Sequence, residues 1–496
     1  TNLFFVMRLF FCLFLVIFST CFIAETLCAS SLLYSGSFWP TPGANFQRTH
    51  HTNSYGSITA LPRLAFSSKY PQSSSKFEVV DGGKGQLYFN MGRTGSFSGH
   101  SHAQLNAQTG HRGDLVATPG SIEFVDNKGF LIVYGQGSKT ISAMNGTNKE
   151  WSVSTAGSQV GIVGSNFVTP TRTEYYGAIG NIFWSSDQFG LLWSFSLPDA
   201  TGALGYKVSA QVAGSRLALD TTGQFVYLYA SYNDVNNDAS PRMYCIDVAQ
   251  RKVAWFYPVG RYRSPNVPSF TLAGSQLILV TDGSVVSIDA KTGDRLWTQN
   301  DLPYVTLEPV ATQNAVLAVF DGNFGTFSSS QYQGVVAISL KDGTFMYNVS
   351  VPTTEGYSPS APATNRGVGI FGAGRSLYVF DTNSGEQLYT ALVTGSFTGS
   401  AHSSSSLRQN AVAINASGGS AKSMVYTSIT TSDGSVEFAG FTLEPQANAL
   451  CCIYAAKDGS PAAVCNYQGE ATCPSIEGFN PTSSSQVGSC QECFCN

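Results

Sequence analysis

Short apolar runs alternate with polar turns along most of the chain, and one unit recurs. Residues 285–297 show it most clearly: the run Val-Val-Ser-Ile, the polar stretch Asp-Ala-Lys-Thr-Gly, and a second run that ends in Trp297. Alternation with a period of two is typical of a β-strand, and a turn uses glycine where the backbone needs a positive φ. Each unit therefore predicts a β-hairpin whose second strand ends in a large aromatic residue.

Further copies of this unit cover the middle of the chain. Residues 335–347 and 377–389 match it position for position, and residues 243–255 lack only the glycine. Looser or truncated copies are found at residues 105–110, 141–151, 182–193 and 434–440. Self-similarity of this kind indicates one supersecondary unit that is used many times.

The spacing of the copies predicts the architecture. The terminal aromatics recur at steps of 42, 62, 42, 50 and 42 residues. Steps of about 40–50 residues with four strands each are typical of β-propeller blades, which stack face to face around an axis. The long step predicts an insertion at residues 232–238, and the copies predict eight blades, with seven as the alternative. We expect the aromatics to pack between neighbouring blades; they are Trp151, Trp193, Trp255, Trp297, Tyr347 and Tyr389.

The two ends of such a ring must be joined. An open ring exposes sheet edges, which costs stability and favours aggregation. Such rings are commonly closed by one blade that both chain ends build. We therefore expect residues 57–66 to pair with part of residues 411–443.

The repeat also resembles a known family. Copies of the form Ala-x-Asp-x-x-Thr-Gly-x-x-x-Trp resemble the repeat of quinoprotein-type (PQQ-like) propellers, and residues 39–49, Trp-Pro-Thr-Pro-Gly-Ala-Asn-Phe-Gln-Arg-Thr, resemble the segment before their first blade. The resemblance spans residues 38–445. It implies the fold but no single function, because the superfamily holds both dehydrogenases and non-catalytic scaffolds. We favour the scaffold branch.

The N-terminus predicts secretion. Met7 is a plausible start; Arg8 follows it, then an apolar run over residues 9–23 and the small residues of Cys28-Ala-Ser. This order is typical of a signal peptide, and the alternative, a membrane anchor, requires a longer apolar run. We assign residues 1–30 to the signal peptide and residues 31–445 to the propeller. With no second such stretch, the mature chain is predicted to have no stable membrane span.

Cysteines crowd the end of the chain. A long cysteine-poor body with a cysteine-dense end is typical of a core-stabilised domain followed by a small disulfide-stapled module, here residues 446–496. Cys245 stands alone in the middle and is expected to be a buried free thiol, which leaves an odd number for the tail. The disulfide candidates of the tail are Cys451, Cys452, Cys465, Cys473, Cys490, Cys493 and Cys495.

Composition narrows the functional class. Only 12% of the 496 residues are charged and the net charge is −4, which argues against a nucleic-acid partner bound through its phosphates. Three Asn-x-Ser/Thr tripeptides, at Asn145, Asn348 and Asn415, are candidate glycosylation sites of a secreted glycoprotein.

A quinone-dependent dehydrogenase is the first enzymatic alternative. It requires a bound quinone, a Ca²⁺ with carboxylate and amide ligands, and an aspartate base. The pair Cys451–Cys452 resembles the vicinal disulfide of quinoprotein alcohol dehydrogenases, but here it follows the last repeat. Asp247, Asp289 and Asp381 are interpreted as turn residues that cap backbone N–H groups. We assign no quinone or other cofactor.

Metal and hydrolase sites were weighed as well. Five histidines fall within residues 50–111, and two of them have the i, i+2 spacing of one strand face, but no third ligand is fixed. No Gly-x-Ser-x-Gly motif lies in a strand-to-helix context. We therefore assign no metal and no catalytic residue. The five histidines are His50, His51, His100, His102 and His111.

These observations predict an all-β, secreted, quinoprotein-like propeller with a cysteine-rich module. The favoured function is a non-catalytic binding or structural scaffold in the extracellular space, with protein or glycan partners, such as a subunit of an extracellular matrix or filament. Homo-oligomers would form through the tail. The alternatives are a quinone-dependent dehydrogenase and a carbohydrate-active propeller.

Overall fold

The structure is a computed structural model of the whole chain. It describes residues 51–487 with gaps, the longer of which are 53–61, 71–78, 94–99, 155–160, 233–240, 260–268, 303–308, 322–331, 353–359, 393–412, 416–423, 443–448 and 467–478. The predicted signal peptide, the loop expected at residues 232–238 beyond Tyr232, and the segment 39–49 lie outside the described residues.

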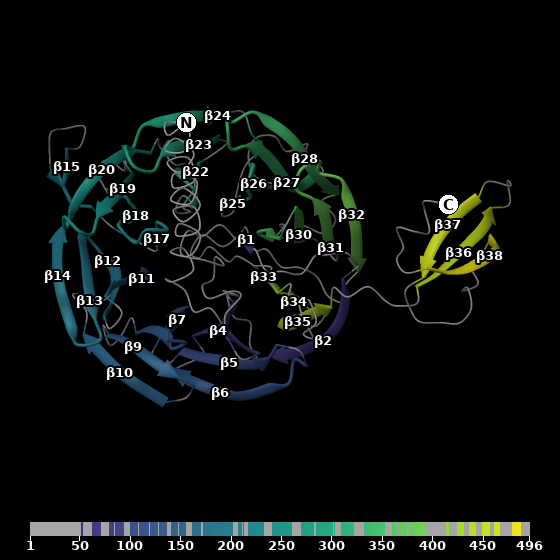
Figure 1. The fold of residues 1–496 in the computed structure, drawn as a ribbon, viewed down its shortest axis with the longest axis horizontal. Helices are drawn as coiled ribbons and strands as arrows, with labels where there is room; N and C mark the ends of the chain where they lie inside the picture. The colour runs from purple at the N-terminus through teal and green to yellow at the C-terminus, as the bar shows by residue number, and fades with distance from the viewer. Residues whose placement is uncertain are drawn as a thin grey trace, which may run out of the picture.

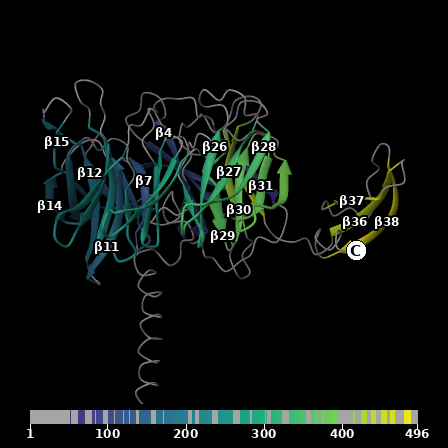
Figure 2. The same ribbon diagram turned by 90° about the horizontal axis from the view of Figure 1, so that it is seen from above.

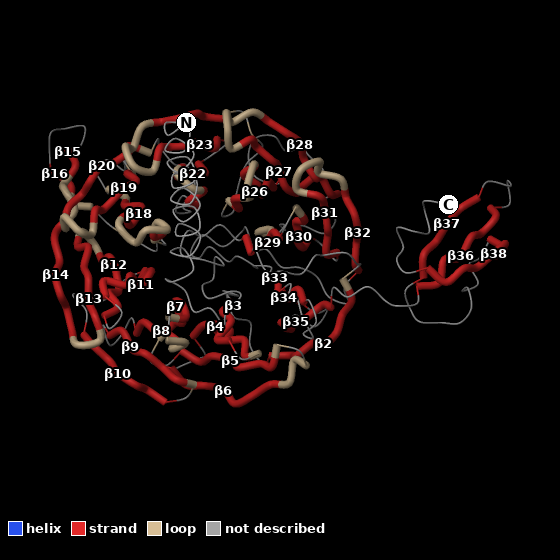
Figure 3. The backbone as a smooth tube through the Cα atoms, in the orientation of Figure 1, coloured by secondary structure: helices blue, strands red, loops and turns tan. Residues whose placement is uncertain are grey.

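The fold is an all-β propeller. Seven sheets of four strands and one of five follow one another around a central axis (Figure 1). Seen from the side, the strands of the ring stand roughly parallel to that axis (Figure 2). The described residues form strands and turns and no helix (Figure 3). None of the described segments is an apolar helix long enough to span a membrane.

The first four sheets are each made of four consecutive antiparallel strands, ordered from the axis outward. They are β3 (Val79–Gly83), β4 (Gln86–Arg93), β5 (His100–Asn106) and β6 (Arg112–Thr118); β7 (Ser121–Val125), β8 (Leu131–Gly135), β9 (Thr140–Asn145) and β10 (Asn148–Ser154); β11 (Gly161–Thr169), β12 (Arg172–Ile179), β13 (Ile182–Asp187) and β14 (Gly190–Ser196); β17 (Ala218–Leu219), β18 (Phe225–Ala230), β19 (Arg242–Asp247) and β20 (Lys252–Pro258).

The next three sheets repeat this order and carry the best copies of the sequence unit. They are β21 (Ser269–Ala273), β22 (Gln276–Thr281), β23 (Ser284–Asp289) and β24 (Arg295–Gln299); β25 (Val310–Ala311), β26 (Ala315–Asp321), β27 (Tyr332–Ser339) and β28 (Phe345–Pro352); β29 (Ala363–Asn365), β30 (Val368–Ala373), β31 (Ser376–Asp381) and β32 (Gln387–Leu392). In each sheet the third and fourth strands form the predicted hairpin, with a register shift between them.

The last sheet closes the ring with both parts of the chain. Strands β33 (Ala413–Asn415), β34 (Met424–Thr430) and β35 (Val436–Thr442) come from the end of the propeller, and β2 (Arg63–Tyr70) adds the outermost strand from its beginning. β2 and β35 are antiparallel, with Ser68 opposite Phe438. The predicted closure is confirmed, although the pairing strand runs on to Tyr70 instead of ending at Phe66.

Three short strands lie outside the four-strand pattern. β1 (His51–Thr52) pairs in parallel with β29, the innermost strand of its sheet, and so makes the fifth strand there. β15 (Ala200–Thr201) and β16 (Lys207–Val208) form an added hairpin between two blades. This hairpin lies within the 62-residue step between Trp193 and Trp255, so the insertion there begins earlier than residue 232.

The core lies between the sheets. Strand β22 is apolar on both faces because a sheet covers each face: Leu277 and Leu279 pack with the preceding blade. Ile278 and Val280 pack with the following one. The outermost strands instead alternate between exposed and half-buried positions, as β20 does, since only one of their faces meets a neighbour.

The tail forms a sheet of its own. β36 (Ala449–Ala456) is the central strand, between β37 (Pro461–Asn466) and β38 (Phe479–Val487). Both neighbours run antiparallel to β36. In Figure 1 this three-stranded sheet lies beside the ring and is connected to it through the chain that follows β35.

Candidate functional site

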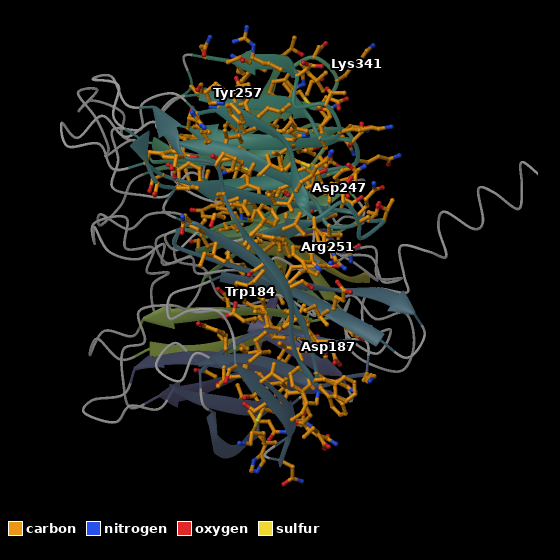
Figure 4. All side chains as sticks on the ribbon, turned by 90° about the vertical axis from the view of Figure 1, so that its left-hand side faces the viewer. Trp184, Asp187, Asp247, Arg251, Tyr257 and Lys341 are labelled. Carbon is orange, nitrogen blue, oxygen red and sulfur yellow. The ribbon has the colours of Figure 1, made fainter. Side chains whose placement is uncertain are left out.

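In the seven blades built from consecutive strands, one face of the ring carries the turns between the first and second strands and between the third and fourth strands; we call it the turn face. In the blade β21–β24 these turns are residues 274–275 and 290–294. Asp187, Asp247, Arg251 and Lys341, from three different blades, lie along this one edge of the molecule (Figure 4).

An aspartate shapes the turn between the third and fourth strands. Asp289 Oδ1 accepts the backbone N–H groups of Lys291 and Thr292, at 2.9 and 2.8 Å. These bonds satisfy donors that the tight turn leaves without strand partners. The interpretation of the repeat aspartates as turn residues is therefore confirmed. The same bond to a following N–H group is made by Asp187, Asp247 and Asp381.

An aromatic side chain of one blade covers the turn glycine of the next. A Cβ atom on Gly293 would lie 2.7 Å from the ring of Trp255, and Gly293 has a φ of 82°. Only glycine combines that backbone with so close a ring. The indole Nε1 of Trp255 also donates a hydrogen bond to Ala290 O at 3.1 Å. The same aromatic–glycine pairs are Trp297 with Gly343, Tyr347 with Gly385, and Phe66 with Gly110.

Two of these joints can be followed atom by atom. Trp297 Nε1 donates to Leu340 O at 3.0 Å. At the closing blade, Tyr426 OH donates to Ala107 O at 2.8 Å, just as Tyr227 OH donates to Ala290 O at 3.1 Å. The truncated copy at residues 105–110 thus accepts a tyrosine hydrogen bond from the neighbouring blade, as the full copy at residues 285–297 does.

One copy departs from this arrangement. Arg251 occupies the position of the missing glycine and still adopts a φ of 55°. Its guanidinium carbon lies 5.9 Å from the ring centre of Trp193 in the preceding blade. A cation over an aromatic face is attractive, so the aromatic here meets a charged side chain instead of bare backbone.

The earlier joint around Trp151 is built differently again. The ring of Trp151 lies 5.3 Å from that of Tyr175 in the next blade, and Tyr175 OH donates to Asp126 Oδ2 at 3.3 Å. Burial raises the pKa of Asp126 above its ordinary value, against the lowering effect of hydrogen bonds from Phe130 and Lys128. Burial also raises the pKa of Tyr175.

A depression of about 1270 Å³ lies on the turn face and spans three blades. Its walls are the turns of the sheets β21–β24, β25–β28 and β29–β32. The polar side chains that line it and are exposed are Ser275, Gln313, Asn314, Lys341 and Asn383. Lys341 is the one charged side chain among the described lining residues.

Hydroxyl, amide and ammonium groups give this depression a definite chemistry. They donate and accept hydrogen bonds without any acid in the lining, so they suit a hydroxyl-rich or anionic ligand. The sequence alone did not predict this site, because its walls come from three blades that are distant in sequence. The signal it offers is weak: Gln313 and Asn314 are a polar pair between two apolar runs.

The three glycosylation candidates lie in three different sheets of the ring. Asn145 and Asn348 are both exposed. The amide of Asn348 donates to Ser350 Oγ, the hydroxyl of its own tripeptide, at 2.8 Å, on the outermost strand β28. Asn415 ends strand β33.

The histidines do not gather into a metal site among the described residues. His100 and His102 lie in β5, His51 in β1, and His111 in an exposed turn; His50 lies outside the described part. The described residues contain no group of three or more His, Cys, Asp or Glu side chains placed to hold a metal ion.

The cysteines separate into two sets. Cys245 is fully buried and unpaired in the core between two blades, and burial raises the pKa of its thiol. Cys451 and Cys452 lie in β36 and Cys465 in β37. The remaining tail cysteines lie outside the described residues; they are Cys473, Cys490, Cys493 and Cys495.

The repeat region matches one family model. That model is described as "Outer membrane protein assembly factor BamB" and matches residues 180–420, the part of the ring with the most regular joints. Over this region the chain is similar to the quinoprotein-type β-propellers. No curated protein sequence matches it.

Two solved quinoprotein dehydrogenases share the fold at low sequence identity. A europium-containing methanol dehydrogenase is 11% identical, with a TM-score of 0.56 over 82% of this chain and 98% of that one. A quinohemoprotein alcohol dehydrogenase from Comamonas testosteroni is 12% identical, with a TM-score of 0.53 over 84% and 82%. BamB from Moraxella catarrhalis is 14% identical, with a TM-score of 0.42 over 76% and 99%. At these identities the likeness concerns the fold alone.

A quinone with its Ca²⁺ does not fit the described residues. Such a site needs converging carboxylate and amide ligands and an aspartate base. Several described acids instead serve the turns or the blade joints, as Asp289 and Asp126 do. Lys341 is the charged group of the depression. We therefore derive no reaction step through a quinone.

Proposed function

We propose that this quinoprotein-type propeller is a secreted, non-catalytic scaffold that binds an acidic glycan on its turn face. The observation that carries the proposal is the depression across three blades, lined by amide and hydroxyl side chains and by Lys341, the one cation among the described lining residues. Amides and hydroxyls suit sugar hydroxyl groups, and an ammonium suits a carboxylate or sulfate. A protein partner at the same face is the alternative outcome of the test.

Two features support an extracytoplasmic location. The signal-like N-terminus and the cysteine-dense tail are both typical of secreted chains. Asn145 and Asn348 are exposed, so both tripeptides are accessible to glycosylation. Peptide mapping of the secreted protein before and after enzymatic deglycosylation tests this, and a mature protein that begins before residue 30 and carries no glycan contradicts it.

An array of neutral, uronate-containing and sulfated oligosaccharides tests the ligand. We expect the acidic glycans to bind, and Lys341→Glu to weaken binding about tenfold, equivalent to about 1.4 kcal/mol. Lys291→Glu is the matched control, since Lys291 is exposed in the equivalent turn of the preceding blade but does not line the depression. Equal loss in both variants, or no binding to any glycan, contradicts the proposal.

The tail adds a second element, assembly of several copies. Cys245 is buried and unpaired, and the tail holds seven cysteines. Seven thiols cannot all pair within one tail, so we infer that one of them links to a second copy in an oxidising compartment. Native mass spectrometry with and without reductant should show an oligomer that falls apart on reduction, unchanged in Cys245→Ala. A monomer in both conditions contradicts assembly.

The dehydrogenase alternative has a separate test. The purified protein is mixed with pyrroloquinoline quinone, Ca²⁺, a primary alcohol and a redox dye. We expect no dye reduction above that of the mixture without protein. Dye reduction that depends on both the quinone and the protein contradicts a non-catalytic role.

A further inference from the structure

The register of the tail sheet places two cysteines directly opposite each other. In the antiparallel pair β36–β37, Cys451 is the partner of Cys465, between the pairs Leu450–Asn466 and Cys452–Val464. Directly opposed residues of an antiparallel pair have Cα atoms about 4.5 or 5.5 Å apart and share one face of the sheet. A disulfide needs Cα atoms about 4.4–6.8 Å apart. The backbone thus provides the spacing that the bond requires.

The same register argues against the other nearby pairings. Cys452 lies opposite Val464 on one side and Ser484 on the other. Successive residues of a strand point to opposite faces, so Cys452 occupies the face opposite to that of Cys451 and Cys465. A Cys452–Cys465 bond would join residues on different faces, and a Cys451–Cys452 bond would join neighbours of one strand that diverge. The adjacent cysteines of this chain are therefore not equivalent.

We propose that Cys451 and Cys465 form a structural disulfide bond across strands β36 and β37, while Cys452 remains outside it. This inference rests on the extracytoplasmic location of the proposed function. Each thiol loses its proton and the two sulfurs together give up two electrons. A disulfide of a thiol–disulfide oxidoreductase accepts both and becomes two thiols. One S–S bond breaks in the oxidant as one forms in this chain.

The bond has a structural purpose in so small a sheet. Three strands bury little apolar surface, and a module of this size usually depends on covalent links. A disulfide between the central strand and one edge strand fixes their register. Without it, a slip by one residue would move every residue of a strand to the opposite face of the sheet. We therefore expect reduction to affect the tail sheet before the propeller, whose described core contains the free thiol of Cys245.

Peptide mapping of the full secreted protein can identify the bond. Free thiols are alkylated under denaturing, non-reducing conditions, and the chain is cut with trypsin and a glutamate-specific protease. Cleavage after Glu437, Lys457 and Glu470 separates the peptide 438–457, with Cys451 and Cys452, from the peptide 458–470, with Cys465 alone. We expect mass spectrometry to find these two peptides linked, and released by reductant.

Three single variants assign the sulfur atoms. Cys451→Ser should abolish the link and Cys465→Ser should do the same, whereas the matched control Cys452→Ser should keep it. A link that persists in Cys451→Ser but disappears in Cys452→Ser overturns the pairing. So does finding Cys465 bonded to a different peptide while other disulfides are present.

The outcomes also separate this inference from the proposed function. If disulfides are present in the tail but Cys465 is bonded elsewhere, the pairing fails and the extracytoplasmic location stands. If every tail cysteine is alkylated as a free thiol in protein collected from its native compartment, the pairing and the location fail together.

Discussion

The joints between neighbouring blades differ between two stretches of the ring. From β17 to β32, the aromatic at the end of one blade covers the turn glycine of the next, as Trp255 covers Gly293. Around β7 to β14, Trp151 instead meets the ring of Tyr175, whose hydroxyl reaches back to Asp126. The same fold therefore uses a repeated joint from β17 to β32, and again where Phe66 of the closing blade covers Gly110, but an individual joint around β7 to β14.

This difference explains why the repeat can be recognised in one stretch of the sequence and not in the other. The repeated joint needs a turn with glycine and an aromatic a fixed number of residues later, so each copy is a local pattern. The individual joint combines residues from two blades with no common spacing. The family model accordingly matches residues 180–420, where the local pattern recurs.

Removing one aromatic from a repeated joint should have the largest effect. Trp255→Ala deletes a large side chain from the joint and is expected to lower the free energy of unfolding by about 3–5 kcal/mol. Trp255→Phe keeps a ring over Gly293 but loses the bond to Ala290 O, at a cost of about 1 kcal/mol for the hydrogen bond, plus a smaller packing loss. Urea denaturation followed by tryptophan fluorescence and circular dichroism measures both. Equal losses in the two variants would show that the ring does not hold the joint.

Alanine in place of glycine at two positions separates the effect of a close aromatic ring from that of backbone strain. Gly293 and Gly274 belong to the same blade and both have a positive φ, but only Gly293 has a ring within 4 Å of the added Cβ. We expect Gly274→Ala to cost about 1 kcal/mol from the left-handed backbone alone, and Gly293→Ala to cost about 1–3 kcal/mol more from overpacking. Thermal denaturation of the two variants gives the comparison. A loss in Gly274→Ala as large as that in Gly293→Ala would contradict it.

The copy with Arg251 in place of the turn glycine allows a test with a smaller expected effect, in which the glycine is restored. Arg251→Gly relieves a positive φ, worth about 1 kcal/mol, but removes a cation over Trp193 worth about 0.5–1 kcal/mol. The two nearly cancel, so its stability should match that of the wild type. Arg251→Ala keeps the strained backbone and loses the cation, and we expect it to be less stable than Arg251→Gly by about 1 kcal/mol. The reverse order, measured by urea denaturation, would show that the positive φ of residue 251 does not cost the stability expected of it.

The individual joint, which contains Asp126, should make the stability of the protein depend on pH. Burial raises the pKa of Asp126 above 3.8, so the folded state holds that proton more tightly than the unfolded state. Its contribution to stability is present below about pH 3.8 and is lost as the pH rises through the raised pKa. Asp126→Asn cannot titrate, so its stability relative to the wild type should increase as the pH rises through the acid range.

A control of opposite sign accompanies this test. The side-chain hydrogen bond from Thr344 lowers the pKa of the exposed Asp342, so its contribution is present above pH 3.8 and is lost as the pH falls. Asp342→Asn should therefore lose stability relative to the wild type as the pH rises. Urea midpoints measured across the acid range check both slopes, and parallel slopes for the two variants would contradict the assignment.

Much of the ring could be predicted from the chain alone. The alternation of apolar residues, the Asp-to-Gly turns and the spacing of the aromatics predicted hairpins, blades and closure by an N-terminal strand. Each of these depends on contacts within one hairpin or on the edge rule for sheets. The position of the closing strand was less accurate, because the end of that strand depends on where its partner β35 begins.

The sequence by itself determined the repeated parts of this protein: the hairpins, their turn aspartates and the solitary buried thiol of Cys245. Tertiary structure alone decided the parts that combine distant segments. The depression brings Gln313, Lys341 and Asn383 together from different blades, and Tyr175 reaches Asp126 across a blade joint. The register between β36 and β37 likewise places Cys465 opposite Cys451, whereas Cys452 lies opposite Val464. The physical reason is that local patterns are set by backbone geometry within one hairpin, whereas sites between blades depend on how the sheets stack.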